Sequence, residues 1–278
     1  MQTMYALIRG VIARLEIPPP SATVMRGICW GAFDELLTPA YWKGQAWQHS
    51  RLDTYGDFRL GRTFTEEVAA CLLGGYGIPA EIGLAAFRRL RDSGLLAAGC
   101  SAARIERVLL QPFFYDGRSR RYRFARQKAT YLAETLRALD GVELPNNDVE
   151  LRNLLMTLKG IGPKTASWIV RNYRGSDSVA IIDVHVLRAG RHIGLFEEEL
   201  RSDQHYFRLE NDFLAFAAAI EVRPALLDAL MWDYMRRLGA GAVNANPSRP
   251  LHAQQSHREH GPLAPLQHRQ HVAAMPEH

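Results

Sequence analysis

The sequence predicts an all-α protein whose helices form two lobes. Apolar residues recur at helical spacing through most of the chain, strand-like alternation is almost absent, and Gly, Pro or Asn residues separate the periodic segments. About ten helices are expected, which is too many for one small bundle and favours two packed helical lobes. A cleft between two lobes is a natural ligand site.

The composition excludes several classes of protein. With 278 residues, 47% of them apolar and 23% charged, the chain is typical of a folded protein and not of collagen, a coiled coil or a disordered polymer. The three cysteines (Cys29, Cys71 and Cys100) are widely spaced, which predicts neither a disulfide framework nor a metal site and favours a cytoplasmic location. The start of the chain is not typical of a signal peptide, and no apolar run is long enough to predict a membrane span. The net charge of +5 permits a polyanionic partner without requiring one.

The first elements are predicted from apolar spacing and helix breakers. Residues 1–17 place Met4, Leu7, Ile8 and Val11 at helical spacing, and three prolines follow directly, so we expect an amphipathic helix there. A capped helix is expected to begin at Phe64 and to end at a glycine-rich loop.

The remaining elements follow the same pattern as far as residue 241. Further helices are expected over 80–93, 101–111, 123–139, 149–159, 163–173, 184–193, 204–220 and 224–238. Residues 242–278 hold six of the ten histidines among Pro and Gln, without periodicity, which predicts a disordered tail and no metal site.

A helical hairpin is predicted over residues 151–173. Gly160 and Gly162 flank the apolar Ile161 and break the helical pattern, and Pro163 suits the first position of the second helix. A glycine-rich turn before a helix exposes unpaired amides at the positive end of the helix dipole, where a phosphate can bind. An ordinary helix connection is the alternative.

Two further residues point to chemistry near this turn. Lys164 lies in the first turn of the second helix, where the dipole disfavours a cation, and such a position suits a nucleophilic amine. Asp183 follows two isoleucines and precedes an apolar helical pattern, so it is expected to cap that helix.

The segments LKGIGPKTASWIVRN and AIIDVHVLR resemble the helix-hairpin-helix DNA glycosylase superfamily. The resemblance is carried by the hairpin glycines, by a lysine at the position of Lys164 that marks the bifunctional glycosylase/lyase members, and by an aspartate at the spacing of Asp183. Weaker similarity extends from about residue 64 to residue 240. Within the superfamily the chain is most similar to the short 8-oxoguanine DNA glycosylase/AP lyases, and it lacks the clustered cysteines of the iron–sulfur branch related to endonuclease III.

The resemblance implies an activity and a set of site residues. It implies that the partner is double-stranded DNA with a damaged base, which is extruded from the stack before Lys164 attacks the sugar and Asp183 stabilises the developing positive charge. The DNA backbone is expected at Gly160, Ile161 and Gly162, with a monovalent cation at the hairpin carbonyls and no iron–sulfur cluster. It also implies a monomer associated with the nucleoid.

The base pocket and the rest of the DNA interface are less well defined by the sequence. The resemblance suggests Trp168, Asp228 and Trp232 for the base pocket, although a tryptophan on a helix is more often a core residue. Tyr76 or Ile78, in the glycine-rich loop after the helix predicted from Phe64, is a candidate to fill the gap that the extruded base leaves. Packing of this residue on its own lobe is the alternative. His185 is expected to be satisfied locally. The run Arg118, Arg120, Arg121, Arg123 and Arg126 either contacts phosphates or covers a solvated helix face.

Three functional hypotheses are compatible with the sequence. The first is a glycosylase and AP lyase acting on an oxidised purine, most of all 8-oxoguanine. The second keeps the chemistry but assigns another damaged or modified base, and the third is a non-catalytic helix-hairpin-helix module that binds DNA structure. The expected domain spans residues 1–241, with one lobe over about 64–163 and the other formed by the N-terminal segment and 164–241.

Overall fold

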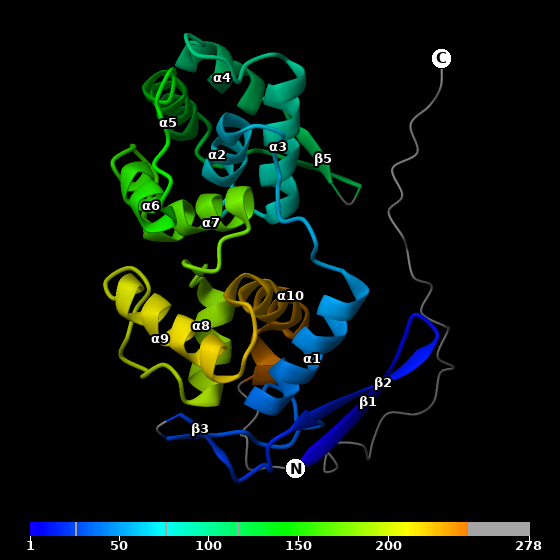
Figure 1. Ribbon diagram of the computed structural model, residues 1–278. Coiled ribbons are helices and arrows are strands. Elements are labelled where there is room, and N and C mark those ends of the chain that lie inside the picture. Colours follow the sequence, from blue (N-terminus) through cyan, green and yellow to red (C-terminus); the bar gives the residue numbers. More distant parts are fainter. Residues whose placement is uncertain (26, 76, 116, 244–278) are drawn as a thin grey trace. The chain divides into compact units, whose positions relative to one another are not determined.

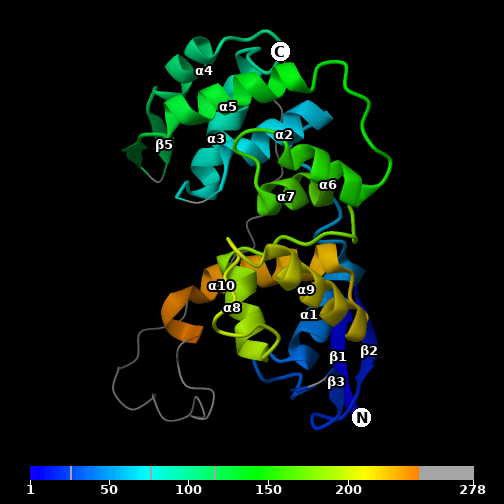
Figure 2. The same cartoon turned by 90° about the vertical axis from the view of Figure 1, so that its left-hand side faces the viewer.

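The computed structural model describes residues 1–25, 27–75, 77–115 and 117–243. Within these residues it has ten helices and three two-stranded sheets, which confirms a mainly helical fold (Figure 1 and Figure 2). The chain divides into two compact units, Met1–Gly239 and Ala240–His278, and the described residues cover chiefly the first. The predicted tail therefore lies almost wholly outside the described residues, and so does Tyr76.

The described helices are α1 (Pro39–Leu52), α2 (Phe64–Leu73), α3 (Ala80–Asp92), α4 (Ala102–Leu109), α5 (Ala125–Ala138), α6 (Asp148–Met156), α7 (Pro163–Arg174), α8 (Val184–Ile193), α9 (Tyr206–Ala219) and α10 (Pro224–Val243). All of them except α1 lie close to predicted segments, with shifts at their ends. The strands are β1 (Gln2–Ile8), β2 (Val11–Ile17), β3 (Thr23–Met25), β4 (Ile28–Cys29), β5 (Phe113–Tyr115) and β6 (Arg118–Arg120). None of the described helices has the length and apolar character that a membrane crossing requires.

The helix predicted over residues 1–17 is wrong, because this segment is the β1–β2 hairpin. The strands pair antiparallel, with Leu7 opposite Ile12, and the chain reverses at Arg9 and Gly10. Both turn residues have positive φ angles, 51° and 82°, which is the geometry that a two-residue hairpin loop requires. One side of the hairpin packs on α1, where the Sδ atom of Met4 lies 2.7 Å from the point that a Cβ at Gly44 would occupy.

Helix α1 is a second difference from the prediction, since no helix was expected there. Thr38 caps it by accepting a hydrogen bond from the Tyr41 amide, and Pro39 occupies its first position. Its buried side includes Trp42, which is fully buried. Polar residues such as Lys43, Gln45 and Gln48 interrupt its apolar positions, so its apolar period is weak and does not predict a helix.

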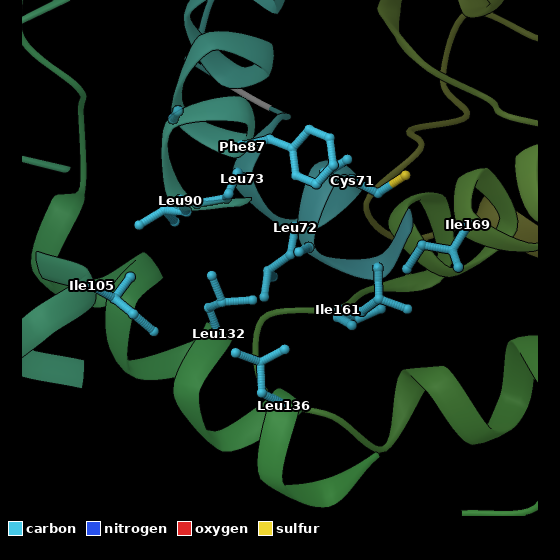
Figure 3. Packing of buried hydrophobic residues seen from close by; sticks show 14 of the residues in the cluster. Cys71, Leu72, Leu73, Phe87, Leu90, Ile105, Leu132, Leu136, Ile161 and Ile169 are labelled. Atoms are coloured by element: carbon cyan, nitrogen blue, oxygen red, sulfur yellow. The ribbon is translucent and has the colours of Figure 1, made fainter. Parts of the chain in front are cut away.

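One large core cluster lies within the segment that contains α2 to α7. Residues from all six helices contribute buried apolar side chains to it, and Figure 3 shows Leu72, Leu132 and Ile161 among them. Ile161 comes from the turn between α6 and α7 and is only 4% exposed. The turn is therefore anchored in the core by its middle residue, while Gly160 and Gly162 on either side of it remain exposed.

Candidate active site

The turn between α6 and α7 includes a glycine whose backbone lies directly against another side chain. Gly160 has a φ angle of +80°, and a Cβ added there would lie 2.2 Å from the Cδ2 atom of Tyr131. Gly162 precedes α7 with a φ angle of −88° and has nothing within 4 Å of its Cβ position. The Ile161 amide donates to the Leu158 carbonyl at 3.2 Å, so it closes the turn. Among the three residues expected to face DNA, Gly160 and Gly162 are thus better placed for a ligand than Ile161.

Lys164 lies half-buried in the first turn of α7, and a second lysine lies close to it. Lys128 of α5 donates to the carbonyl oxygens of Leu72, at 2.6 Å, and Gly74, at 3.4 Å. Burial lowers the pKa of Lys128, and the charge of Lys164 lowers it further. Lys128 was not predicted, because nothing in the sequence around it indicates that α5 brings it beside α7.

Trp168 lies one turn beyond Lys164 and packs on the end of α2. Its Cη2 atom is 3.0 Å from the Cβ position of Gly74, and the indole is half-buried against the core cluster. Gly74 also contacts Lys128, because its carbonyl oxygen accepts the hydrogen bond from Lys128 described above. Lys164, Lys128, Trp168 and Gly74 therefore form one group of neighbours at the start of the loop that follows α2.

Asp183 caps α8, as its sequence position predicts. Its Oδ1 atom accepts hydrogen bonds from the amides of His185, at 2.8 Å, and Val186, at 3.0 Å. The cap fixes the direction of the carboxylate, because one oxygen is held by two backbone donors. The other carboxylate oxygen of Asp183 takes no part in this cap, and Asp183 is half-buried.

His185 lies beside this carboxylate, and Trp232 packs against His185. The Nδ1 atom of His185 lies 2.9 Å from a guanidinium nitrogen of Arg188, and its ring meets Trp232 edge to face with centroids 6.4 Å apart. The guanidinium of Arg236 lies over the indole of Trp232 at 4.7 Å. Burial lowers the pKa of His185, although the charge of Asp183 opposes that shift. His185 is satisfied locally, as predicted.

Buried carboxylates hold the segment that leads to Asp183. Glu210 of α9 accepts hydrogen bonds from the Ala180 amide, at 3.0 Å, and from Ser167 of α7, at 2.8 Å, and it pairs with Arg152 of α6. None of these contacts was predicted from the sequence. They fasten the approach to Asp183 onto the two helices of the hairpin.

Asp228 of α10 joins the same segment to the helix of Lys164. Its Oδ2 atom accepts from the Ile181 amide at 3.0 Å, and its Oδ1 atom lies 3.5 Å from Arg171 of α7. Arg171 in turn lies over the ring of Phe58 at 4.4 Å. Asp228 is only 2% exposed, and its carboxylate faces protein groups. The structure thus gives Asp228 a bracing position, and the base contact expected for it stays a prediction.

The burial of Asp228 predicts a change of stability with pH. Burial raises its pKa to about 6 from an ordinary value of 3.8, so the folded protein holds this proton more tightly than the unfolded chain does. The stability that the proton provides is present below pH 3.8 and is lost as the pH rises through about 6. Relative to Asp228→Asn, the unfolding free energy of the wild type should fall by about 2 kcal/mol between about pH 4 and pH 7. Urea unfolding at both pH values measures the difference, with exposed Asp140→Asn as the control, and a difference independent of pH would contradict the expectation.

The contacts gather the predicted residues into two groups. Lys164 and Trp168 belong to the group around Gly74, whereas Asp183 and Trp232 belong to the group around His185. Asp228 connects the two groups, because it contacts Arg171 on α7, the helix of Lys164, and accepts from the amide of Ile181, two residues before Asp183. Within the described part of the chain, no cluster of three His, Cys, Asp or Glu residues is arranged to hold a metal ion.

Comparison with protein families relates this geometry to known proteins. The family model for 8-oxoguanine DNA glycosylase, of the helix-hairpin-helix type, matches residues 50–222, which is more than half of the chain. The matched range includes Lys164 and Asp183. It ends before Asp228 and Trp232, and it begins after the β1–β2 hairpin.

Individual relatives agree with the family match. An 8-oxoguanine DNA glycosylase/AP lyase of Metallosphaera sedula is 35% identical over 117 residues, which are 40% of this chain, and the match spans only 57% of that relative. A protein of the same name from Saccharolobus solfataricus is 28% identical over 65% of this chain and 88% of its own length. A crystal structure of the Methanocaldococcus jannaschii 8-oxoguanine glycosylase/lyase with a 15mer DNA containing 8-oxoguanine superposes with a TM-score of 0.53 at 24% identity, over 71% of this chain and 96% of that one. The last comparison shows that the two chains share a fold.

Proposed function

This chain belongs to the helix-hairpin-helix 8-oxoguanine DNA glycosylase family, and we propose on this premise that it excises an oxidised purine, 8-oxoguanine above all, from duplex DNA and then cleaves the strand. The observation that carries the proposal is the placement of two residues. An amine, Lys164, directly follows the glycine turn, and a carboxylate, Asp183, is fixed by its helix cap on a segment braced to the same helix. A module that only binds DNA needs the turn but not this pair.

The chemistry assigned to the pair is nucleophilic substitution followed by elimination. The Lys164 nitrogen bonds to C1′ of the extruded nucleotide, the bond from C1′ to the base breaks, and the base leaves with the bonding electrons and takes up a proton. Asp183 stabilises the positive charge that develops on the sugar and accepts the proton that the lysine releases. The nitrogen lone pair then forms a C=N bond as the bond from C1′ to the ring oxygen O4′ breaks, and O4′ takes up a proton, which gives an open-chain Schiff base. The Schiff base loses a proton from C2′, the bond from C3′ to its oxygen breaks, and the 3′ phosphate leaves with the bonding electrons.

The glycine turn is assigned to the DNA backbone. The amides at Gly160, Gly162 and Lys164 lie at the positive end of α7, where they suit a phosphate oxygen. A monovalent cation at the turn would be held by backbone carbonyls, because the oxygens of Leu158 and Gly162 each accept one amide and keep a second lone pair. Such a cation would add positive charge beside the phosphate.

The two glycines of the turn provide a matched test of this assignment. Gly160→Ala should destabilise the protein by about 1 to 2 kcal/mol from its left-handed backbone, with the clash against Tyr131 in addition. Gly162→Ala should leave stability almost unchanged, since its backbone and surroundings accept a methyl group. It should nevertheless weaken DNA binding about tenfold or more, because the methyl keeps a phosphate from the charge-assisted hydrogen bond.

Thermal unfolding and fluorescence anisotropy with a labelled duplex separate the two effects. If Gly162→Ala binds duplex DNA as tightly as the wild type, the Gly162 amide is not a phosphate ligand.

Borohydride trapping tests the proposed function itself. Purified protein would be incubated with duplexes that carry 8-oxoguanine, an oxidised pyrimidine, an abasic site or no lesion. A covalent adduct on the 8-oxoguanine duplex is the expected result, because the Schiff base is reduced to a stable amine. An adduct on the abasic duplex alone would keep the lyase and reject the base assignment, and an adduct on the pyrimidine duplex would move the specificity to another base. No adduct on any duplex would reject the enzyme in favour of a DNA-binding module.

A further inference from the structure

Five arginines gather on the β5–β6 hairpin and the start of α5, a region that the proposed chemistry does not use. We call Arg118, Arg120, Arg121, Arg123 and Arg126 the arginine surface. The structure places the first two on β6 and the last in the first turn of α5. The helix expected from residue 123 therefore begins later, and the basic run is a hairpin edge with a following loop instead of a helix face.

The arginine surface carries a net positive charge that the described protein does not neutralise. All five side chains are exposed. No carboxylate within residues 1–25, 27–75, 77–115 and 117–243 lies within 4.0 Å of any of the five, whereas several other arginines, such as Arg201 and Arg208, are paired. Exposed and uncompensated arginines are typical of a surface that binds a polyanion.

The arginine surface is continuous with the candidate active site. Arg123 approaches the loop after α2, since its Nη1 atom lies 3.0 Å from the Cβ position of Gly77. Further along α5, Lys128 binds the carbonyls of Leu72 and Gly74, and Tyr131 lies against Gly160 of the glycine turn. Helix α5 thus leads from the arginine surface to Lys128, which lies beside Lys164 and the end of α2, and then to Tyr131 at the glycine turn proposed to bind phosphate.

Aromatic side chains are interleaved with these arginines. Phe114 on β5 is 83% exposed and lies opposite Ser119, while Tyr115 lies opposite Arg118. A shallow groove of about 650 Å³ lies beside the first part of α5. Its lining is mostly apolar and includes Tyr122, Phe124 and Tyr131, together with Arg126, Gln127 and one carboxylate, Glu106. Exposed aromatics beside arginines are a combination that nucleic acids bind through their bases and phosphates.

We propose that the arginine surface binds the phosphates of the DNA duplex on one flank of the damaged nucleotide. The inference rests on the proposed function, because it takes duplex DNA as the substrate. A duplex anchored by one phosphate at Gly160 and Gly162 extends past α5, and the arginines then contact the strand several nucleotides from the lesion. The contact is electrostatic and independent of sequence, so it positions the duplex and does not select the base.

Salt-dependent binding to trimmed duplexes tests this inference. Arg118→Ala/Arg120→Ala would be made in a Lys164→Gln background, so that no strand is cut, and compared with Arg104→Ala/Arg107→Ala, which removes the same charge from exposed positions of α4. Fluorescence anisotropy would be recorded from about 50 to 200 mM salt. Three duplexes would be used: one extended on both sides of the lesion, one trimmed on the 5′ side and one trimmed on the 3′ side.

The expected result is specific to one flank. On the extended duplex Arg118→Ala/Arg120→Ala should bind several-fold more weakly. Its plot of log K against log salt should also be less steep, with the magnitude of the negative slope reduced by about one for each arginine removed. The loss should disappear on one of the two trimmed duplexes, and the α4 variant should show no such loss. Equal binding by the two double variants, or the same loss on both trimmed duplexes, would overturn the inference. The binding measurement does not depend on catalysis. If the protein excised no base, the proposed function would be rejected, while a loss of binding on one flank would still support the arginine surface as a DNA contact.

Discussion

Lys164→Gln is expected to abolish both strand cleavage and borohydride trapping while DNA binding persists. Glutamine keeps most of the length of the side chain and is a good helix former, so α7 and the glycine turn should remain intact. It has no amine to form the Schiff base, and the rate of cleavage should fall more than about a thousandfold, as it does when other enzymes lose their nucleophile. Single-turnover cleavage and trapping gels give the rate, and anisotropy gives the affinity.

Lys128 makes this experiment sharper, because it is a second amine close to Lys164. Its Nζ atom is engaged by the carbonyls of Leu72 and Gly74, which should keep it from attacking the sugar. If Lys164→Gln still forms an adduct and Lys164→Gln/Lys128→Met does not, Lys128 is the nucleophile and the assignment is wrong. Lys159→Gln, which removes an exposed lysine from the turn between α6 and α7, is the matched control and should still cleave the strand.

The turn and the cap were predictable because local chemistry determines them. Gly160 needs a left-handed backbone that few other residues adopt, and Pro163 and Asp183 suit the first turns of helices by their own geometry. Each of these preferences is decided within a few residues of chain. The amino-acid sequence is therefore enough to infer the helix-hairpin-helix arrangement and the positions of its lysine and aspartate.

The N-terminal hairpin was not predictable from spacing alone. Met4, Leu7, Ile8 and Val11 fit a helix, but Met4 and Ile8 also fall on one face of a strand, so both periods describe the segment. The choice depends on Arg9, whose φ angle of 51° is uncommon for a residue other than glycine, and on packing against α1. Only Gly10 indicates the turn, and a single glycine inside a periodic segment is weak evidence against a helix.

The bracing carboxylates could not be predicted for a different reason. Glu210 binds the Ala180 amide and Ser167, and Asp228 meets Arg171, so each partner is tens of residues away in sequence. Polar residues on helices usually face solvent, and no local pattern distinguishes a buried carboxylate from an exposed one. These contacts matter because a buried carboxylate must be paired, and here the pairing fixes the segment that carries Asp183.

Asp183 has two roles that a single pair of substitutions should separate. As a cap it binds the amides of His185 and Val186, and as a carboxylate it is assigned to the charge on the sugar. Asparagine caps helices about as well as aspartate does, so Asp183→Asn should keep α8 and lose only the interaction of a negative charge with the helix dipole, about 0.3 to 1 kcal/mol. The excision rate should nevertheless fall about 10² to 10⁴-fold, because the amide neither takes up the lysine proton nor stabilises a cation.

Asp183→Ala should lose the same activity and, in addition, about 1 kcal/mol of stability with the cap. Urea unfolding and single-turnover excision on the 8-oxoguanine duplex measure the two effects on the same proteins. If Asp183→Asn excises the base at the wild-type rate while Asp183→Ala is impaired in proportion to its instability, Asp183 is a helix cap and nothing more. If Asp183→Asn is stable and inactive, the charge itself is required, and the position that α8 gives this carboxylate serves the reaction as well as the fold.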